Sequence, residues 1–103
     1  MRENLECNFT IAAADDISSA EVQSDDRHRL VAKIDADNGD INLNFSSRRA
    51  MYDFAKSLLQ EAIYGDSGQQ EFQPLISDGS PLVVNGVRMP SGSSRIFVFY
   101  PNE

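Results

Sequence analysis

One long window of the chain, from Ser46 to Gly65, has apolar residues recurring with a helical period. Side chains three and four residues apart fall on one side of a helix. The members of this apolar stripe are Met51, Phe54, Ala55, Leu58, Leu59, Ala62 and Ile63. Ser46 or Ser47 can cap the first turn, and Gly65 can end the helix in a left-handed conformation. The pattern predicts one long amphipathic helix whose stripe lies against a sheet.

The N-terminal segment from Leu5 to Ala13 alternates between apolar and polar residues, which predicts a strand with one buried face. The segment that follows, from Ala14 to Asp26, is acidic and rich in serine and contains no basic residue. This composition favours a solvated loop, with a short edge strand over Ser19 to Gln23 as a weaker alternative. A negative patch for a basic partner is the functional interpretation of the same residues.

The segment from Leu30 to Phe45 predicts a hairpin that turns at Asn38-Gly39, because both of these residues tolerate a positive φ. A two-residue turn there sets the register. The expected pairs are Ala36 with Ile41, Ile34 with Leu43, and Ala32 with Phe45. All six residues are apolar and share one face, so we expect this face to lie under the helix.

The C-terminal third contains several short strands and turns. Glu71 to Ile76 predicts a weak strand, which Pro74 restricts to an edge. Turns are expected at residues 78–81, at Asn85-Gly86 and at residues 90–93.

The last predicted strand, Arg95 to Tyr100, is apolar on both faces, with Phe97 and Phe99 on one of them. One helix covers only one face of a sheet. The other face is therefore either buried by the chain's own loops or exposed as an aromatic patch for a partner.

These elements predict a single α+β domain over residues 1–103. We expect one antiparallel sheet of roughly five or six strands with a single long helix packed across one face. The strand over Arg95 to Tyr100 is expected to be central in this sheet or covered by a partner.

The formal net charge of −7 over 103 residues disfavours nucleic acid as a partner and favours a basic protein. The one cysteine, Cys7, permits no internal disulfide, which fits the cytoplasm. The N-terminus lacks the apolar run of a signal peptide, and no apolar run is long enough to span a membrane. We therefore expect no membrane partner.

Catalytic and metal-binding patterns are sparse. Residues 35–40 begin like a calcium loop, but the glycine comes one residue early and Ser46 stands where the final Glu is required. His28 is the one histidine, so a zinc site has too few soft ligands. No cofactor, metal ion or catalytic cluster is expected, and a small hydrolase around His28 is the least favoured function.

The leading hypothesis is a non-catalytic protein-binding module, of which a small immunity- or inhibitor-type protein acting on a basic partner is one example. The expected partner-binding residues form an acidic and an aromatic set. They are Asp15, Asp16, Glu21, Asp25, Asp26, Phe97 and Phe99. The alternative is a structural homodimer assembled through the C-terminal strand, with Phe97 and Phe99 in the interface.

Overall fold

The computed structural model describes residues 10–11 and 19–102 and has α+β architecture. The predicted strand over Leu5 to Ala13 falls almost entirely outside these residues, as do Asp15 and Asp16. The described helices are α1 (Ala20–Ser24) and α2 (Arg48–Tyr64). The described strands are β1 (Leu30–Ile34), β2 (Ile41–Phe45), β3 (Gln69–Phe72), β4 (Ile76–Ser77), β5 (Ser80–Pro81), β6 (Val83–Val84), β7 (Val87–Arg88) and β8 (Ile96–Phe99).

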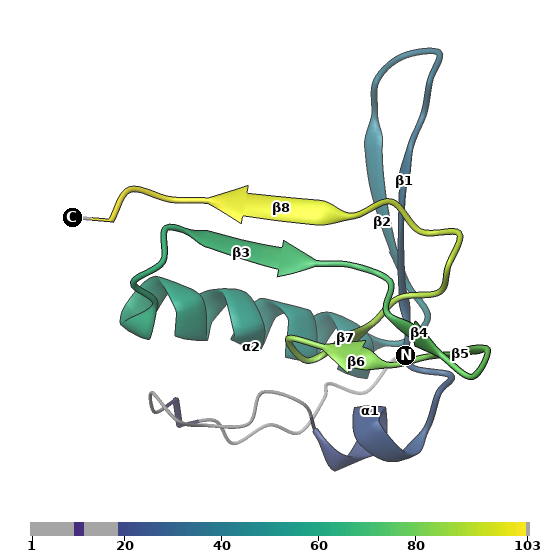
Figure 1. Cartoon of the computed structure of the whole chain (residues 1–103), viewed down its shortest axis with the longest axis horizontal. Helices are drawn as coiled ribbons and strands as arrows, with labels where there is room; N and C mark the ends of the chain where they lie inside the picture. The colour runs from purple at the N-terminus through teal and green to yellow at the C-terminus, as the bar shows by residue number, and fades with distance from the viewer. Residues whose placement is uncertain (1–9, 12–18, 103) are drawn as a thin grey trace, which may run out of the picture.

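The strands form four antiparallel two-stranded sheets, β1–β2, β3–β8, β4–β5 and β6–β7, which corrects the prediction of one sheet. Figure 1 shows β3 and β8 running along α2, while the β1–β2 hairpin rises across them near the start of β8. Pro74, Pro81 and Pro90 lie in or beside the short strands. Because proline has no backbone N–H, pairing cannot extend through these positions.

The long helix is confirmed, and α2 begins after Ser47, whose hydroxyl accepts the N–H of Ala50 at 3.1 Å. The expected left-handed end at Gly65 is wrong, because its φ is −70°. The Gly65 N–H donates to the Glu61 carbonyl at 2.8 Å. A Cβ at Gly65 would lie 2.5 Å from that carbonyl oxygen, so close backbone approach explains the glycine here.

The face that α2 buries differs from the predicted stripe. Ala50, Asp53 and Ser57 are the buried residues of the helix. Of the stripe, Phe54 and Leu58 pack against the core, whereas its other members are exposed. The helix is turned because hydrogen bonds hold Asp53 against Ser19 and Ser57 against Gln70. Buried polar side chains with partners can therefore override an apolar period.

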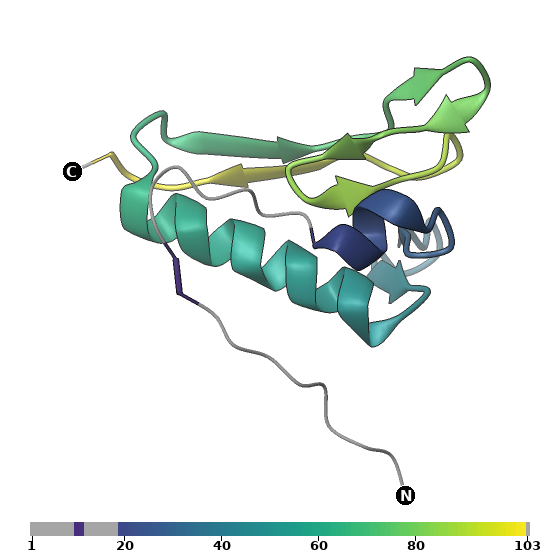
Figure 2. The same ribbon diagram turned by 90° about the horizontal axis from the view of Figure 1, so that it is seen from below.

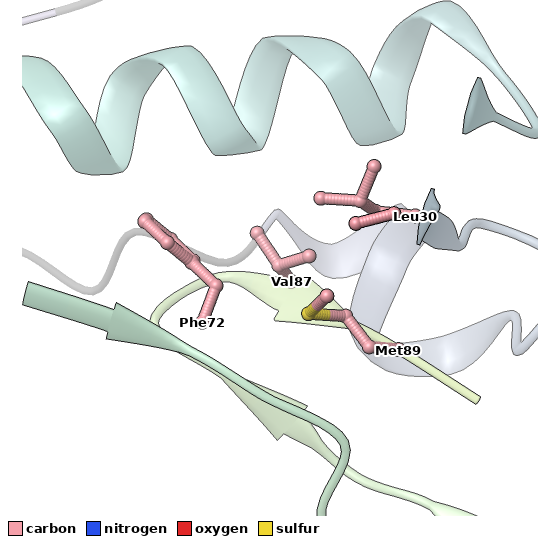
Figure 3. Close-up of a cluster of buried hydrophobic side chains, with 5 residues drawn as sticks. Leu30, Phe72, Val87 and Met89 are labelled. Atoms are coloured by element: carbon pink, nitrogen blue, oxygen red, sulfur yellow. The ribbon is translucent and has the colours of Figure 1, made fainter. Parts of the chain in front are cut away.

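The core lies between α2 and the strands, and Figure 3 shows Leu30, Phe72, Val87 and Met89 in the space beside α2. The buried cluster consists of Leu30, Ala32, Phe72, Val87 and Met89. The ring centroids of Phe54 and Phe72 are 4.8 Å apart, which links α2 to β3. The core therefore combines residues of β1, β3 and β7 with Met89, which follows β7. Figure 2 shows these elements from below.

The β1–β2 hairpin forms, but its register differs by two residues from the predicted one. Leu30 pairs with Phe45, Ala32 with Leu43, and Ile34 with Ile41. The connection is longer than two residues because the side chains of Asp35 and Asn38 accept the N–H groups of Asp37 and Asp40 at 2.9 and 2.8 Å. Such side-chain acceptors stabilise a wider turn. A shift of two keeps every side chain on its predicted face.

Only the base of this hairpin is buried. Leu30 and Ala32 belong to the core, whereas Ile34 is 64% exposed and Ile41 is 72% exposed. The expectation that Ile34 and Leu43 lie under the helix is therefore wrong. The hairpin projects past the β3–β8 layer, as Figure 1 shows, and we call its outer part, residues 33–43, the arm.

Three smaller elements complete the fold. Residues 20–24 form helix α1 with buried Val22, so the alternative of a strand over Ser19 to Gln23 is wrong. The turns at Asp78-Gly79 and Asn85-Gly86 are confirmed, with φ of 51° and 78° in the first and 51° and 82° in the second. The turn before β8 is confirmed by the Ser93 N–H, which donates to the Pro90 carbonyl at 3.0 Å.

Candidate binding surface

Among residues 10–11 and 19–102, strand β8 pairs with β3 alone and so lies at the edge of its two-stranded layer, which corrects the expectation of a central strand. Its register with β3 pairs Gln70 with Val98, and the Tyr100 N–H donates to the Gly68 carbonyl at 3.0 Å. In an antiparallel ladder, alternate residues bond to the same neighbour. The backbone groups of Val98 and Tyr100 therefore face β3, and those of Phe97 and Phe99 face outward, along the free edge visible in Figure 1.

The side chains of Phe97 and Phe99 form an exposed aromatic pair. They are 40% and 70% exposed, and their ring centroids are 6.4 Å apart with an interplanar angle of 12°. The Arg95 guanidinium lies 5.0 Å from the centroid of the Phe97 ring. Ile96 and Val98, which alternate with them, pack against the core. Of the two outcomes left open by the sequence, the structure has the exposed aromatic patch.

One side of α2 presents a second apolar area, which we call the helix flank. It consists of Met51, Ala55, Leu58, Leu59 and Ala62. A cavity of about 370 Å³ lies between this flank and β8 and is lined by Leu58, Ala62, Val98 and Tyr100, among others. The helix flank and the free edge of β8 therefore border the same space.

The arm lies beside the N-terminal end of β8. A cavity of about 240 Å³ between the arm and β8 is lined by Ile34, Ile41, Leu43, Ile96 and Phe97, among others. Another cavity, of about 390 Å³, joins Phe45 of β2 to Met51 of the helix flank. We call the edge of β8 with its aromatic pair, the helix flank and the arm, which border these three separate cavities, the apolar corner.

The acidic residues predicted to bind a partner lie elsewhere. Glu21, Asp25 and Asp26 lie on α1 and the turn that follows it, on the opposite side of the molecule from β8 in Figure 1. The structure therefore does not bring the acidic and aromatic sets together. Two of the three carboxylates also have cationic neighbours, since Asp25 contacts Arg27 at 2.8 Å and Asp26 contacts Arg29 at 3.7 Å.

Hydrogen bonds from Arg27, above all from its guanidinium, hold the pKa of Asp25 well below its usual range. The Asp25 carboxylate is therefore ionised and already paired within the chain. This pairing reduces what Asp25 can offer to an incoming cationic group, because its charge is partly neutralised.

His28 lies near both a serine and an aspartate. Its Nδ1 is 2.6 Å from the Ser47 hydroxyl oxygen, and its Nε2 is 3.8 Å from Asp25 Oδ2. The second distance exceeds a hydrogen bond, so the carboxylate does not orient the imidazole as a Ser-His-Asp triad requires. Ser47 also accepts the Ala50 N–H as the cap of α2. The arrangement is better explained as a link between the start of α2 and the turn after α1.

A buried polar seam joins α2 to α1 and β3. Asp53 Oδ2 accepts the Ser19 N–H at 2.8 Å, and the Gln70 amide donates to the Ser57 hydroxyl at 2.9 Å. Burial raises the pKa of Asp53 above its ordinary value. Arg88, also buried, donates to the carbonyls of Val22 and Asp25 and holds α1 against β7. The seam and Arg88 position the elements that carry the apolar corner.

Sequence reasoning identified the residues of the helix flank as an apolar stripe but expected them to lie against a sheet, and it missed the seam. The signal available for the seam was the four-residue spacing of Asp53 and Ser57, which places both on one side of α2. Within residues 10–11 and 19–102, no group of three or more His, Cys, Asp or Glu residues is arranged to hold a metal ion. Over the same described ranges, no helix has the length and apolar character needed to cross a membrane.

Comparison of the chain with protein-family models, with curated proteins and with solved structures finds no match.

Proposed function

We propose that this chain is a non-catalytic protein-binding module and that it binds through the apolar corner. The observation that carries the proposal is the free edge of β8, whose outward backbone groups belong to the exposed residues Phe97 and Phe99. An edge strand of this kind is a template for another strand. Natural edges are usually protected by lysine, proline or a covering loop, and residues 96–99 contain neither lysine nor proline.

Apolar burial supplies the driving force in this proposal. Removal of apolar surface from water favours association, and part of this gain is offset by the loss of translational and rotational freedom. The helix flank borders one cavity beside β8, and the arm and Phe97 border another, so a partner strand on the edge of β8 would lie next to both. A strand added to β8 would place alternate side chains towards the helix flank and towards the face of Phe97 and Phe99.

The charge part of the hypothesis has weaker support. The net charge of −7 still favours a basic partner, as an immunity- or inhibitor-type protein would have. However, Asp25 and Asp26 are paired within the chain and lie away from the apolar corner. We assign steering at long range to the net charge and binding to the apolar corner. The single cysteine fits a cytoplasmic setting for this role.

Affinity capture from a lysate of the source organism tests the proposal. The double variant Phe97→Ser, Phe99→Ser should lose the proteins that the wild-type chain retains. The matched control, Leu75→Ser with Leu82→Ser, alters two leucines of similar exposure outside the apolar corner and should retain them. Retention should also persist at high salt, because apolar contacts are not screened. Equal retention by the Phe97/Phe99 variant and the wild type would contradict the proposal.

A homodimer is the second candidate, and one observation favours it. The outward backbone groups of β8 belong to two residues placed symmetrically about Val98, so the edge is complementary to itself.

A further inference from the structure

The free edge of β8 ends at defined points on both sides. At its N-terminal end, the Ser94 N–H donates to the Ala32 carbonyl at 2.8 Å, so the base of the arm lies beside the start of β8. At its C-terminal end, Pro101 has no N–H to donate. Within β8, Phe97 and Phe99 are the residues whose backbone groups face outward, and Arg95 continues the alternation just before the strand. An incoming strand centred opposite Val98 would pair with both Phe97 and Phe99.

We propose that the partner at the apolar corner is a second copy of this chain, bound by antiparallel pairing of β8 with β8 about a twofold axis. The inference rests on the proposed function and names its partner. Phe97 of each copy lies opposite Phe99 of the other and exchanges both backbone hydrogen bonds with it. Val98 lies opposite the second copy's Val98 on the axis, and the two layers become one four-stranded sheet.

The geometry of α2 fits this arrangement. The twofold axis is perpendicular to the sheet, so both copies of α2 lie on the same face and run antiparallel. A layer of two strands is ~10 Å wide, which matches the 8–10 Å between the axes of packed helices. The helix flank borders β8, so the flanks of the two copies meet across the axis. Met51, Leu58 and Ala62 then pack against the other copy's flank.

The charges at the ends of α2 and the protection of the other edge of the layer also favour a second copy, against the repulsion between two chains of net charge −7. Arg48 lies in the first turn of α2, where a cation opposes the helix dipole, and no basic residue lies in the last turn. Antiparallel packing places this cationic end beside the C-terminal half of the other helix, where a cation is favourable. On the far side of the layer, the Asn85 amide donates to the Glu71 carbonyl at 2.7 Å and blocks part of that edge. Pairing through β8 therefore closes as a dimer.

The arm gains a contact in the same dimer. The arm rises past β8 at the N-terminal end of this strand. Antiparallel pairing places the C-terminal end of the second copy's β8 at the same position. The exposed Ile34, Ile41 and Leu43 are then covered by that end of the second copy. One symmetric contact thus covers strand edge, helix flank and arm together.

Disulfide trapping tests the pairing. In a Cys7→Ser background, the Val98→Cys variant should form a disulfide-linked dimer under mild oxidation. Residues directly opposite in a non-hydrogen-bonded pair have Cα atoms ~4.5 Å apart, within the range of a disulfide. The matched controls are Phe97→Cys and Phe99→Cys, which are more exposed in the single chain. Each would lie ~7–8 Å from its counterpart as a diagonal neighbour, so neither should be linked efficiently.

Sedimentation equilibrium of the unmodified chain provides the second measurement and does not depend on how well the variants fold. It should give a monomer–dimer equilibrium that the double variant Phe97→Ser, Phe99→Ser shifts to monomer. A monomer at every concentration would overturn the dimer, as would linkage at residue 97 or 99 with none at 98. If the chain is monomeric and the Phe97/Phe99 variant still loses captured proteins, the protein-binding function stands and the second copy is wrong.

Discussion

The backbone of Ala32 in β1 donates its N–H to the Ser93 hydroxyl at 2.8 Å, and this contact joins the hairpin to the turn before β8. Ser94 completes the link, since its N–H donates to the Ala32 carbonyl. Ala32 and the Ser93-Ser94 pair, which are far apart in the chain, thus fix the position from which the arm rises. The apolar corner depends on this link, because it sets the angle between arm and edge strand.

Replacing Ser93 with alanine should destabilise the fold by about 1–2 kcal/mol, because it leaves the buried Ala32 N–H without an acceptor. Ser91→Ala is the matched control, since Ser91 lies in the same turn and is exposed. Urea denaturation of both variants measures the difference. A loss in Ser93→Ala no greater than that in Ser91→Ala would contradict the proposed role of the hydroxyl.

Two leucines on the same face of the hairpin should differ sharply in their contribution to stability. Leu30 is 0% exposed at the base, and Leu43 is 39% exposed in the arm. Leu30→Ala should cost about 2–5 kcal/mol through lost burial and a residual cavity. Leu43→Ala should cost less than about 1 kcal/mol, measured at dilutions where monomers predominate. Equal losses would mean that the arm packs onto the body.

Asp53 should make stability depend on pH in a defined direction. Its pKa is raised by burial, so the folded state holds this proton more tightly than the unfolded chain does. The stability that this group contributes is fully present below the ordinary pKa of Asp and is lost as pH rises through the raised value. Denaturation midpoints of the wild type and of Asp53→Asn, measured from about pH 4 to about pH 7, test this.

The midpoint of Asp53→Asn should rise relative to that of the wild type across this window, because Asn keeps an acceptor for the Ser19 N–H and does not ionise. A constant difference between the two proteins at every pH would show that Asp53 does not titrate there. Asp25 should show the opposite dependence. Because its pKa is lowered in the folded state, the stability that it contributes is lost as pH falls.

Substitution of Gly39 in the turn of the arm should destabilise the fold because of the backbone conformation at this position. Its φ is +78°, and a Cβ there would meet no atom within 4 Å, so crowding is not the issue. Gly39→Ala should cost about 1–2 kcal/mol, the penalty of an L-residue in the left-handed region. Gly92→Ala is the control, because Gly92 has equal space and no positive φ and should be nearly neutral. Chemical denaturation compares the two.

The sequence predicted the start of α2 and the turns near the C-terminus well. The N-cap at Ser47 and the Asp78-Gly79 and Asn85-Gly86 turns follow from short-range rules, whereas the sequence left open whether the aromatic face at Phe97 is buried or exposed. Each depends on a few neighbouring residues whose preferences agree. Where no long-range partner competes with such a preference, the local rule holds.

Long-range partners account for the errors. The apolar period of α2 points Met51 and Leu59 towards a sheet, yet the hydrogen bonds of Asp53 and Ser57 turn the helix so that these residues form the helix flank. The hairpin register moved because the side chains of Asp35 and Asn38 support a wider turn. Ser19 and Gln70, the partners of the seam, come from other elements, and spacing within one helix does not identify them.

The central claim is that the outward edge of β8 is a pairing surface, and residue-resolved hydrogen exchange of its amides tests it most directly. The Val98 and Tyr100 amides, which face β3, should be protected at every protein concentration. The Phe97 and Phe99 amides should exchange freely in dilute protein and become protected as the concentration rises or a binding partner is added. Exchange at Phe97 and Phe99 that stays fast under all of these conditions would contradict the account.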